Sequence, residues 1–298
     1  MKLVALLAIA AVAVMTAAPQ GDVVFRSGVS LVRLDVEAVD TNGRVVPGLT
    51  KDDFRILDNG VAQLPGNFSF AEEPLDLILL FDTSGSMRGK LFSVVRATEL
   101  GFHELRPGDR AAVWTFNDDS TEVLPFTENL QSVNEAILLR VPEAGFRGGS
   151  KSEDAAAVAA RRFQTEPKTH RKRAIVIVTN KPGTHSLDEA AAVRELWKAD
   201  VVVSELILSG APQTRLLEAG AHALVDRTGG ASIAAGNPGE AFRDAVHYVR
   251  SGYTMYYAMP EASAGSERGV QVGLTPEAAR RLPNVRIRAR SGYIVPAA

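Results

Sequence analysis

Residues 75–86 of the 298-residue chain read LDLILLFDTSGS. The first seven of them are apolar except for Asp76, a pattern typical of a short strand buried on both faces of a parallel sheet. Asp82 follows this strand, and Ser84 and Ser86 come directly after it. Ligands of open α/β sheets bind beyond the carboxyl ends of the strands, so we expect these oxygen-bearing side chains to lie in such a position.

Segments that resemble strands and helices alternate from residue 74 to residue 250. Further strands are expected over residues 110–116, 122–126, 174–179, 201–208 and 231–234. Helices are expected over residues 91–105, 129–140, 153–163, 187–198, 214–224 and 240–249. The alternation predicts an α/β fold class, with a doubly wound, mostly parallel, Rossmann-like sheet and helices on both faces.

Short strand patterns and turn signals lie on both sides of this region. Apolar and polar residues alternate over residues 32–38, and the hairpin signal Asn42-Gly43 follows. Alternation over residues 285–290 places three arginines on the outward face of a strand near the C-terminus. Small sheets are rarely stable alone, so we expect the two flanks to pair into one β-sandwich-like domain. The predicted organisation is therefore an N-terminal β segment, 21–73, an inserted α/β domain, 74–250, and a C-terminal β segment, 251–298.

The N-terminus has the pattern of a secretory signal peptide. A basic start precedes an apolar run over residues 3–14, and small residues follow at positions 16–18. This predicts a signal peptide over residues 1–18 and a secreted, periplasmic or cell-surface location; the alternative is a buried N-terminal helix. We expect no transmembrane segment in the mature chain, because no later apolar stretch approaches roughly 20 residues.

Composition narrows the possible functions. Apolar residues form 46% and charged residues 23% of the chain, which excludes wholesale disorder. Lys and Arg number 33 against 35 Asp and Glu, so the charge balance indicates no nucleic-acid partner. The chain has no cysteine, which excludes disulfides, thiolate metal sites and cysteine nucleophiles. An enzyme is not expected, because neither a Gly-x-Ser-x-Gly nucleophile elbow nor a His-Glu-x-x-His zinc motif occurs.

The oxygen donors after the first strand favour a hard divalent cation. Asp82, Ser84 and Ser86 bring a carboxylate and two hydroxyls close together, and Gly85 is expected to permit the tight turn between the serines. Mg²⁺ prefers octahedral oxygen ligands. The alternative is that these side chains cap the helix that follows.

Two later loops supply further oxygen donors. Ser150 follows Gly148-Gly149 and precedes a helix-like run, and Thr179-Asn180, which leaves the second buried strand, could add another oxygen. Because both loops are expected at the same edge of the sheet, their convergence favours a metal site over a cap.

These residues resemble the metal-ion-dependent adhesion site of the von Willebrand factor type A domain. Residues 82–86 match its Asp-x-Ser-x-Ser signature, and residues 148–150 match its Gly-Gly-Thr element with serine in place of threonine. The resemblance implies that Ser84, Ser86 and Ser150 bind Mg²⁺, Mn²⁺ or Ca²⁺, and that Asp82 orients the two serines. Asn180 departs from the pattern, because an aspartate is usual there, and this predicts weaker metal affinity.

The similarity extends beyond the site. Residues 228–230, Thr-Gly-Gly, resemble the turn before the last strand of the same domain. Residues 45–54 and 57–60, together with the strand at 288–293, resemble exported bacterial proteins described as von Willebrand factor A-related, which are frequent in acidobacteria.

The expected function is binding rather than catalysis. The resemblance implies a protein-binding or adhesion module whose cation engages an acidic group of a protein partner, with Asp118, Asp119 and His185 at the rim. One alternative is a structural scaffold with a vestigial metal site. Another is a Mg²⁺-dependent nucleotide-binding protein, because residues 145–152 differ from a P-loop only by Ser150 in place of its second glycine.

Overall fold

The computed structural model describes residues 30–90, 101–167, 170–181, 188–208, 210, 214–217 and 222–297. The predicted signal peptide, most of the predicted helix at 91–105, and His185 lie outside the described residues.

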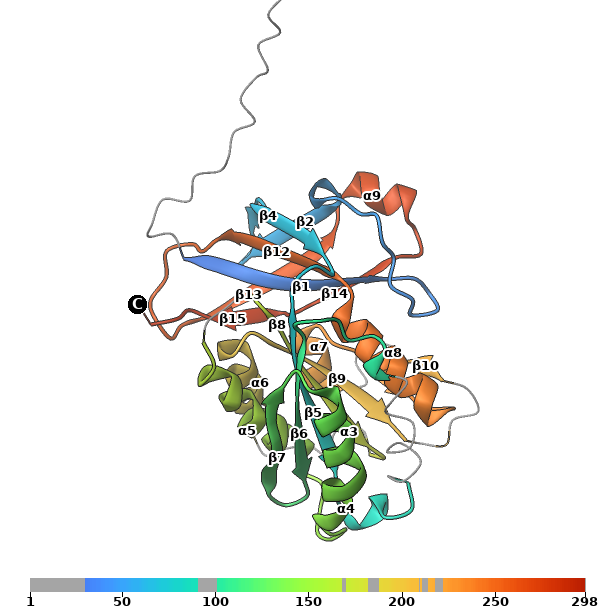
Figure 1. Ribbon diagram of the computed structural model, residues 1–298. Coiled ribbons are helices and arrows are strands. Elements are labelled where there is room, and N and C mark those ends of the chain that lie inside the picture. The colour runs from blue at the N-terminus through green and yellow to red at the C-terminus, as the bar shows by residue number, and fades with distance from the viewer. Residues whose placement is uncertain are drawn as a thin grey trace, which may run out of the picture. The chain divides into compact units, whose positions relative to one another are not determined.

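A seven-stranded sheet runs through the middle of the chain (Figure 1). Its strands are β5 (Leu75–Asp82), β6 (Arg110–Phe116), β7 (Ser120–Thr127), β8 (Lys172–Thr179), β9 (Val201–Ile207), β10 (Arg215–Leu216) and β11 (Ser232–Ala234). They are arranged in the order β10-β11-β9-β8-β5-β6-β7. The five inner strands are parallel, and β7 and β10 are antiparallel edges. The predicted α/β fold class, with a doubly wound and mostly parallel sheet, is confirmed.

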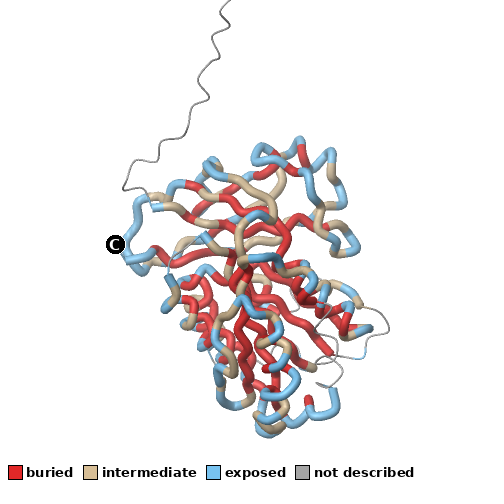
Figure 2. The backbone as a smooth tube through the Cα atoms, viewed as in Figure 1, coloured by how far each residue is buried: buried red, intermediate tan, exposed pale blue. Residues whose placement is uncertain are grey.

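Helices cover both faces of this sheet because its central strands are apolar on both sides. One face carries α3 (Leu130–Glu135), a π-helical turn (η3, Ala136–Arg140), α4 (Val141–Glu143) and α8 (Pro238–Arg250). The other carries α5 (Ser152–Gln164), α6 (Glu189–Lys198) and α7 (Ala223–Thr228). In β5, Leu77 and Leu79 pack into the first layer, while Ile78 and Leu80 pack into the second. Figure 2 shows the resulting band of buried backbone along the strands.

The helix predicted over residues 214–224 is wrong. Residues 215–216 form β10 instead, and α7 begins only at Ala223. Leu216 lies opposite Ile233 in an antiparallel pair. Hydrogen bonding to the edge strand β11 therefore outweighed the helical pattern of this segment.

Two four-stranded antiparallel sheets combine strands from both ends of the chain. Their strands are β1 (Leu31–Val39), β2 (Phe54–Asp58), β3 (Val61–Gln63), β4 (Asn67–Phe70), β12 (Tyr253–Ala258), β13 (Glu267–Leu274), β14 (Arg286–Ala289) and β15 (Gly292–Ile294). One sheet has the order β14-β1-β12-β4 and the other β15-β13-β2-β3. They share an apolar core, and η1 (Lys51–Asp53) and α9 (Pro276–Arg281) belong to the connecting segments. The domain boundaries themselves stay a prediction, because Leu31–Ala298 form one compact unit.

A buried ion pair joins these strands to the amino end of the parallel sheet. Lys172, the first residue of β8, places its Nζ 2.9 Å from Glu37 Oε1 on β1 and donates a hydrogen bond to Ser251 O at 2.8 Å. Burial raises the pKa of Glu37 to about 7, although the ammonium of Lys172 opposes the shift. The amino end of the sheet is therefore covered, and the carboxyl ends lie at the opposite edge.

Of the three arginines that the alternation placed outside, Arg286 is exposed, but Arg288 and Arg290 do not face solvent. Arg290, directly after the strand, is 8% exposed and pairs with Asp200 at 2.6 Å. Arg288 donates hydrogen bonds to Gly230 O and Leu217 O. The outward face of this strand packs against the α/β part, so the alternation correctly gave two faces but not the surroundings of each.

Candidate metal-ion site

Asp82 ends β5 and is fully buried at the carboxyl edge of the sheet. Its Oδ1 accepts a hydrogen bond from the backbone N–H of Ser84 at 2.8 Å. Its Oδ2 accepts from the hydroxyl of Ser150 at 2.8 Å and from the hydroxyl of Thr179 at 2.6 Å. One carboxylate thus connects three loops that are far apart in sequence.

The remaining predicted donors lie beside this carboxylate. Ser84 Oγ and Ser86 Oγ are 3.3 Å apart, and the Ser86 hydroxyl donates to Asn180 Oδ1 at 3.1 Å. The amide of Asn180 in turn donates to Ser86 O at 3.3 Å. The structure therefore brings all five predicted residues together in one hydrogen-bond network. Ser84 is linked to Asp82 through its backbone N–H, and the other links are made by side chains.

Topology explains why the loops meet here. β5 lies between β6 and β8, so the chain leaves β5 on one side and later returns on the other. In α/β sheets, the end of a strand at which the chain changes direction in this way is a common place for ligands to bind. The loop after β5 is fixed by Thr83, whose backbone N–H and hydroxyl both donate to Phe116 O at the end of β6.

The loop that carries Ser150 is shaped by two glycines and an aspartate. Gly148 has φ of +69°, and a Cβ there would lie 2.1 Å from Asp118 Oδ2. The N–H of Gly149 donates to the same oxygen at 3.2 Å. Asp118, predicted at the rim, therefore holds this loop in place, whereas Asp119 is exposed in the turn between β6 and β7.

The predicted role of Gly85 is wrong. Its φ is not in the left-handed region, and a Cβ at this position would meet nothing within 4 Å. The turn is made instead by Asp82, which accepts the N–H of Ser84 at the start of the short 3₁₀ helix η2 (Gly85–Met87). Ser84 makes no side-chain cap bond to this helix. The helix expected over residues 91–105, to which the capping alternative refers, begins outside the described residues, so that alternative is not tested.

Thr179 is a site residue that the predicted set of metal ligands did not include. It is fully buried, and its hydroxyl makes the shortest of the three hydrogen bonds to Asp82. The available signal was a hydroxyl at the last position of β8, immediately before Asn180.

The donor set can hold a hard cation but carries little negative charge. Neighbouring ligands of an octahedral Mg²⁺ are about 2.9 Å apart, given metal–oxygen distances of about 2.0–2.1 Å. The 3.3 Å between Ser84 Oγ and Ser86 Oγ is close to this spacing. Asp82 is the only carboxylate of the five residues, and the described part of the chain holds no cluster of three or more His, Asp or Glu side chains suited to a metal. The residues thus fit a hydroxyl-rich site with a single formal charge.

The nucleotide-binding alternative loses its structural basis. A P-loop follows a buried strand and cradles phosphate with its backbone. Here the segment before residues 145–152 is the helix α4, and the hydroxyl of Ser150 points to Asp82.

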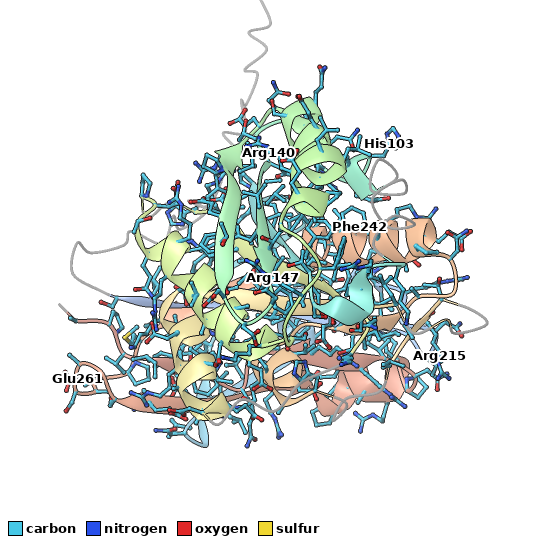
Figure 3. All side chains as sticks on the ribbon, turned by 90° about the horizontal axis from the view of Figure 1, so that it is seen from below. His103, Arg140, Arg147, Arg215, Phe242 and Glu261 are labelled. Atoms are coloured by element: carbon cyan, nitrogen blue, oxygen red, sulfur yellow. The ribbon has the colours of Figure 1, made fainter. Side chains whose placement is uncertain are left out.

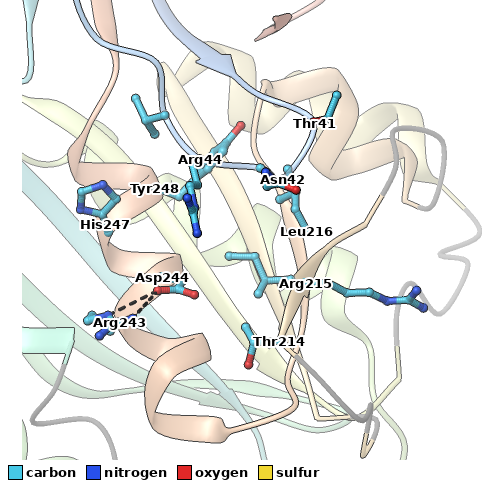
Figure 4. A pocket seen from close by; sticks show the side chains of 13 residues that line it. Thr41, Asn42, Arg44, Thr214, Arg215, Leu216, Arg243, Asp244, His247 and Tyr248 are labelled. Carbon is cyan, nitrogen blue, oxygen red and sulfur yellow. Dashed lines mark hydrogen bonds and ion pairs between the residues drawn. The ribbon is translucent and has the colours of Figure 1, made fainter. Parts of the chain in front are cut away.

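A separate cavity of about 940 Å³ lies away from this site (Figure 4). It is bordered by the turn at 41–45, by β10, by Ile233 of β11, and by α8. Arg243 and Asp244 on its wall pair with each other at 3.1 Å. None of the predicted site residues lines it.

Comparison with known proteins identifies the domain. The family model described as von Willebrand factor type A domain matches residues 77–182, which include all five predicted metal-site residues. Domains of this family mediate protein interactions. No curated protein matches the chain. Among the described residues, no helix combines the length and apolar character needed to cross a membrane.

Solved structures show weaker similarity. A von Willebrand factor type A protein from Catenulispora acidiphila is 14% identical, with 91% of this chain and 76% of that chain covered and a TM-score of 0.49. An aerotolerance-related membrane protein from Bacteroides fragilis is 18% identical, with 59% and 98% covered and a TM-score of 0.47. The vWF domain of the type V pili tip protein Mfa5 from Porphyromonas gingivalis is 16% identical, with 38% and 39% covered and a TM-score of 0.31. The family match thus identifies residues 77–182, which contribute β5 to β8 of the parallel sheet, as similar to the von Willebrand factor type A domain.

Proposed function

We propose that the chain is a protein-binding module that engages an acidic group of its partner through a divalent cation. Ser84, Ser86 and Ser150 would bind Mg²⁺ or Mn²⁺ through their hydroxyl oxygens, and Asp82 would orient them and supply negative charge. A hard cation with one protein carboxylate retains positive charge and therefore favours an anionic oxygen from the partner.

The observation that carries this proposal is the convergence of three loops on the buried carboxylate of Asp82. Catalysis is not part of the proposal.

Titration calorimetry with Mg²⁺ and Mn²⁺ tests the metal site. The wild-type protein should bind either ion at millimolar concentration or below, and Asp82→Asn should abolish the heat because it removes the only charged donor. Asp119→Asn, which makes the same change in an exposed turn nearby, is the matched control and should bind like wild type. Absence of binding at millimolar metal, or unchanged binding in Asp82→Asn, would contradict the proposal.

The second candidate is a structural scaffold with a vestigial site. The amide at Asn180, where this family usually has a carboxylate, favours it. Asn180→Asp separates the two candidates. If the wild type binds no metal and the variant gains binding, the site has decayed; similar affinity in both proteins indicates a site that is already competent.

We also propose that the protein is exported and acts at or beyond the cell surface. The apolar run at residues 3–14 supports this. Fractionation with an antibody should detect a shortened chain outside the cytosol; an uncleaved precursor confined to the cytosol would refute the proposal.

A further inference from the structure

Exposed basic side chains surround the candidate metal site. They come from each of the loops that build it except the β6–β7 turn, and all five are solvent-exposed. We call them the basic rim: Arg88, Lys90, Arg147, Lys151 and Lys181.

Hydrogen bonds place three members of the rim at the edge that holds Asp82. Arg88 donates from Nη2 to Phe146 O at 3.2 Å, which joins the loop after β5 to the loop before α5. The backbone N–H of Arg147 donates to Thr83 O at 3.1 Å. The backbone N–H of Lys181 donates to Thr179 Oγ1 at 3.1 Å. These contacts place the three basic residues on the loops that carry the predicted metal ligands.

The other two members extend the rim to either side. Lys151 donates its backbone N–H to Asn117 O at 3.1 Å, beyond the end of β6. Lys90 reaches Leu208 O with its Nζ at 3.2 Å, just past the end of β9. Figure 3, which views the molecule from below, places Arg147 near the middle of this face and Arg215 and Glu261 at its periphery.

The positive charge is local to this edge. Segments 83–90, 117–119, 144–151 and 180–181 contain the five basic residues and two acidic ones, Asp118 and Asp119, while the exposed Glu143 and Asp154 lie just beyond these segments. Asp118 already accepts a hydrogen bond from Gly149. The whole chain, in contrast, has a formal net charge of −2, so general basicity does not explain the rim.

We propose that this edge binds an acidic protein segment with several carboxylates. One carboxylate would occupy the cation site, and the basic rim would contact its neighbours. The inference rests on the proposed function for the first contact only, because the rim attracts anions whether or not a cation is present.

The surroundings favour a protein segment over nucleic acid. Single-stranded nucleic acid is bound largely by stacking on aromatic side chains. The large apolar side chains exposed in the described part of the chain are valines and leucines, with no aromatic ring among them.

A fluorescein-labelled decaglutamate peptide is the probe, measured by fluorescence anisotropy against the full chain. The test variant replaces Arg147, Lys151 and Lys181 together by glutamine. The control is Arg280→Gln, which removes an exposed arginine from α9, the helix between β13 and β14 of the antiparallel sheets. Exposed charge pairs contribute about twofold each, so the triple variant should bind about tenfold more weakly at low salt. Its affinity should also depend less on salt, because screening acts on fewer charges.

The same titration is repeated with a chelator and with Asp82→Asn. Loss of Mg²⁺ dependence in Asp82→Asn with a retained effect of the triple variant supports both proposals. If Mg²⁺ never matters but the triple variant still weakens binding, the cation site fails and the basic rim stands.

Two results would overturn the basic rim. The first is equal binding of decaglutamate to wild type and triple variant, with both proteins folded by circular dichroism. The second is binding of a ten-nucleotide oligothymidine, or of vesicles containing anionic lipid, as tight as that of decaglutamate and equally sensitive to the three substitutions, since this would indicate a general polyanion surface.

Discussion

At the scale of single residues, the site depends on how completely the carboxylate of Asp82 is engaged. Three donors from three segments hold it in a buried position. A buried donor that loses its acceptor costs about 1–3 kcal/mol, so each of these contacts matters for stability as well as for binding.

Thr179→Val tests the hydrogen bond between the Thr179 hydroxyl and Asp82. The variant keeps the branched shape but loses the 2.6 Å hydrogen bond to Asp82, and hydrogen bonds to charged groups contribute about 1.5–3 kcal/mol. We expect chemical denaturation to show a free energy of unfolding about 2 kcal/mol lower, together with weaker Mg²⁺ binding. Thr121→Val, at an exposed position of β7, should change neither quantity. A stable Thr179→Val protein with unaltered metal binding would mean that Thr179 has no role in orienting Asp82.

A buried histidine lies between two carboxylates behind the site. His222, the N-cap residue of α7, has Nδ1 3.2 Å from Glu205 on β9 and Nε2 3.4 Å from Glu153 on α5. All three residues are buried. Burial lowers the pKa of His222, but Glu205 and Glu153 outweigh it, so the pKa is raised above its ordinary value of 6.5.

This raised pKa predicts the direction of a pH effect. The folded protein binds the proton of His222 more tightly than the unfolded chain does, so its stabilisation is complete below pH 6.5 and is lost as pH rises through the higher folded pKa. In the wild type, the free energy of unfolding should therefore fall as pH rises above 6.5. His222→Gln should lack this fall, as measured by denaturation at several pH values. His103→Gln, at an exposed position, should retain the wild-type profile. Parallel profiles for wild type and His222→Gln would contradict the assignment.

At the scale of elements, the loops at the carboxyl edge differ in how strongly their backbone is constrained. The loop before α5 needs a glycine at position 148, because φ is positive and Asp118 fills the space that a side chain would take. The loop after β5 has no such need at Gly85. Two glycines beside the same site therefore have opposite sensitivity to substitution.

Gly148→Ala should lower the free energy of unfolding by about 1–2 kcal/mol, through the left-handed φ and the displaced Asp118. It should also weaken Mg²⁺ binding, because Ser150 lies two residues further along the same loop. Gly85→Ala is the matched control and should be neutral in thermal denaturation and in calorimetry. Equal behaviour of the two variants would show that the loop before α5 adapts more freely than its geometry indicates.

At the scale of the whole molecule, polar contacts fasten the antiparallel sheets to the amino end of the parallel sheet. Lys172 and Glu37 form a buried ion pair across this junction. A second pair, Arg290 with Asp200, joins the segment after β14 to the turn before β9. The junction lies at one end of the parallel strands and the candidate site at the other, so the antiparallel sheets do not cover the site.

Lys172→Met should destabilise the protein in a pH-dependent manner. The pKa of Glu37 is about 7 in the folded protein, above its ordinary value of 4.5, so wild-type stability falls as pH rises between these values. Without Lys172 this pKa rises further, because only the ammonium opposes the effect of burial. The loss should be smaller at pH 6, where Glu37 is largely protonated in both proteins, than at pH 8, where the wild type keeps a paired carboxylate and the variant must either hold a proton or bury an unpaired charge.

Lys198→Met is the control, because Lys198 is exposed on α6 and its pair with Glu195 contributes little. Denaturation monitored by circular dichroism at both pH values gives the comparison. A Lys172→Met penalty that is the same at pH 6 and pH 8 would show that Glu37 does not titrate in this range.

The amino-acid sequence was sufficient for the features that depend on local pattern. The apolar run of β5, the alternation of strand and helix, and the Asp-x-Ser-x-Ser segment predicted the sheet and the edge where the site residues meet. These predictions worked because strands buried on both faces have few polar residues, and because parallel strands bring the loops after them to one edge.

Other features depended on contacts between distant segments. A local pattern did not reveal that residues 215–216 would pair with the edge strand β11, that Arg290 would be buried against Asp200, or that Thr179 would bind Asp82. The basic rim likewise consists of isolated residues in separate loops, and only folding brings their charges together. Periodicity in a sequence reports that a side chain has two kinds of surroundings, but the neighbour that it meets is fixed only when the whole chain has packed.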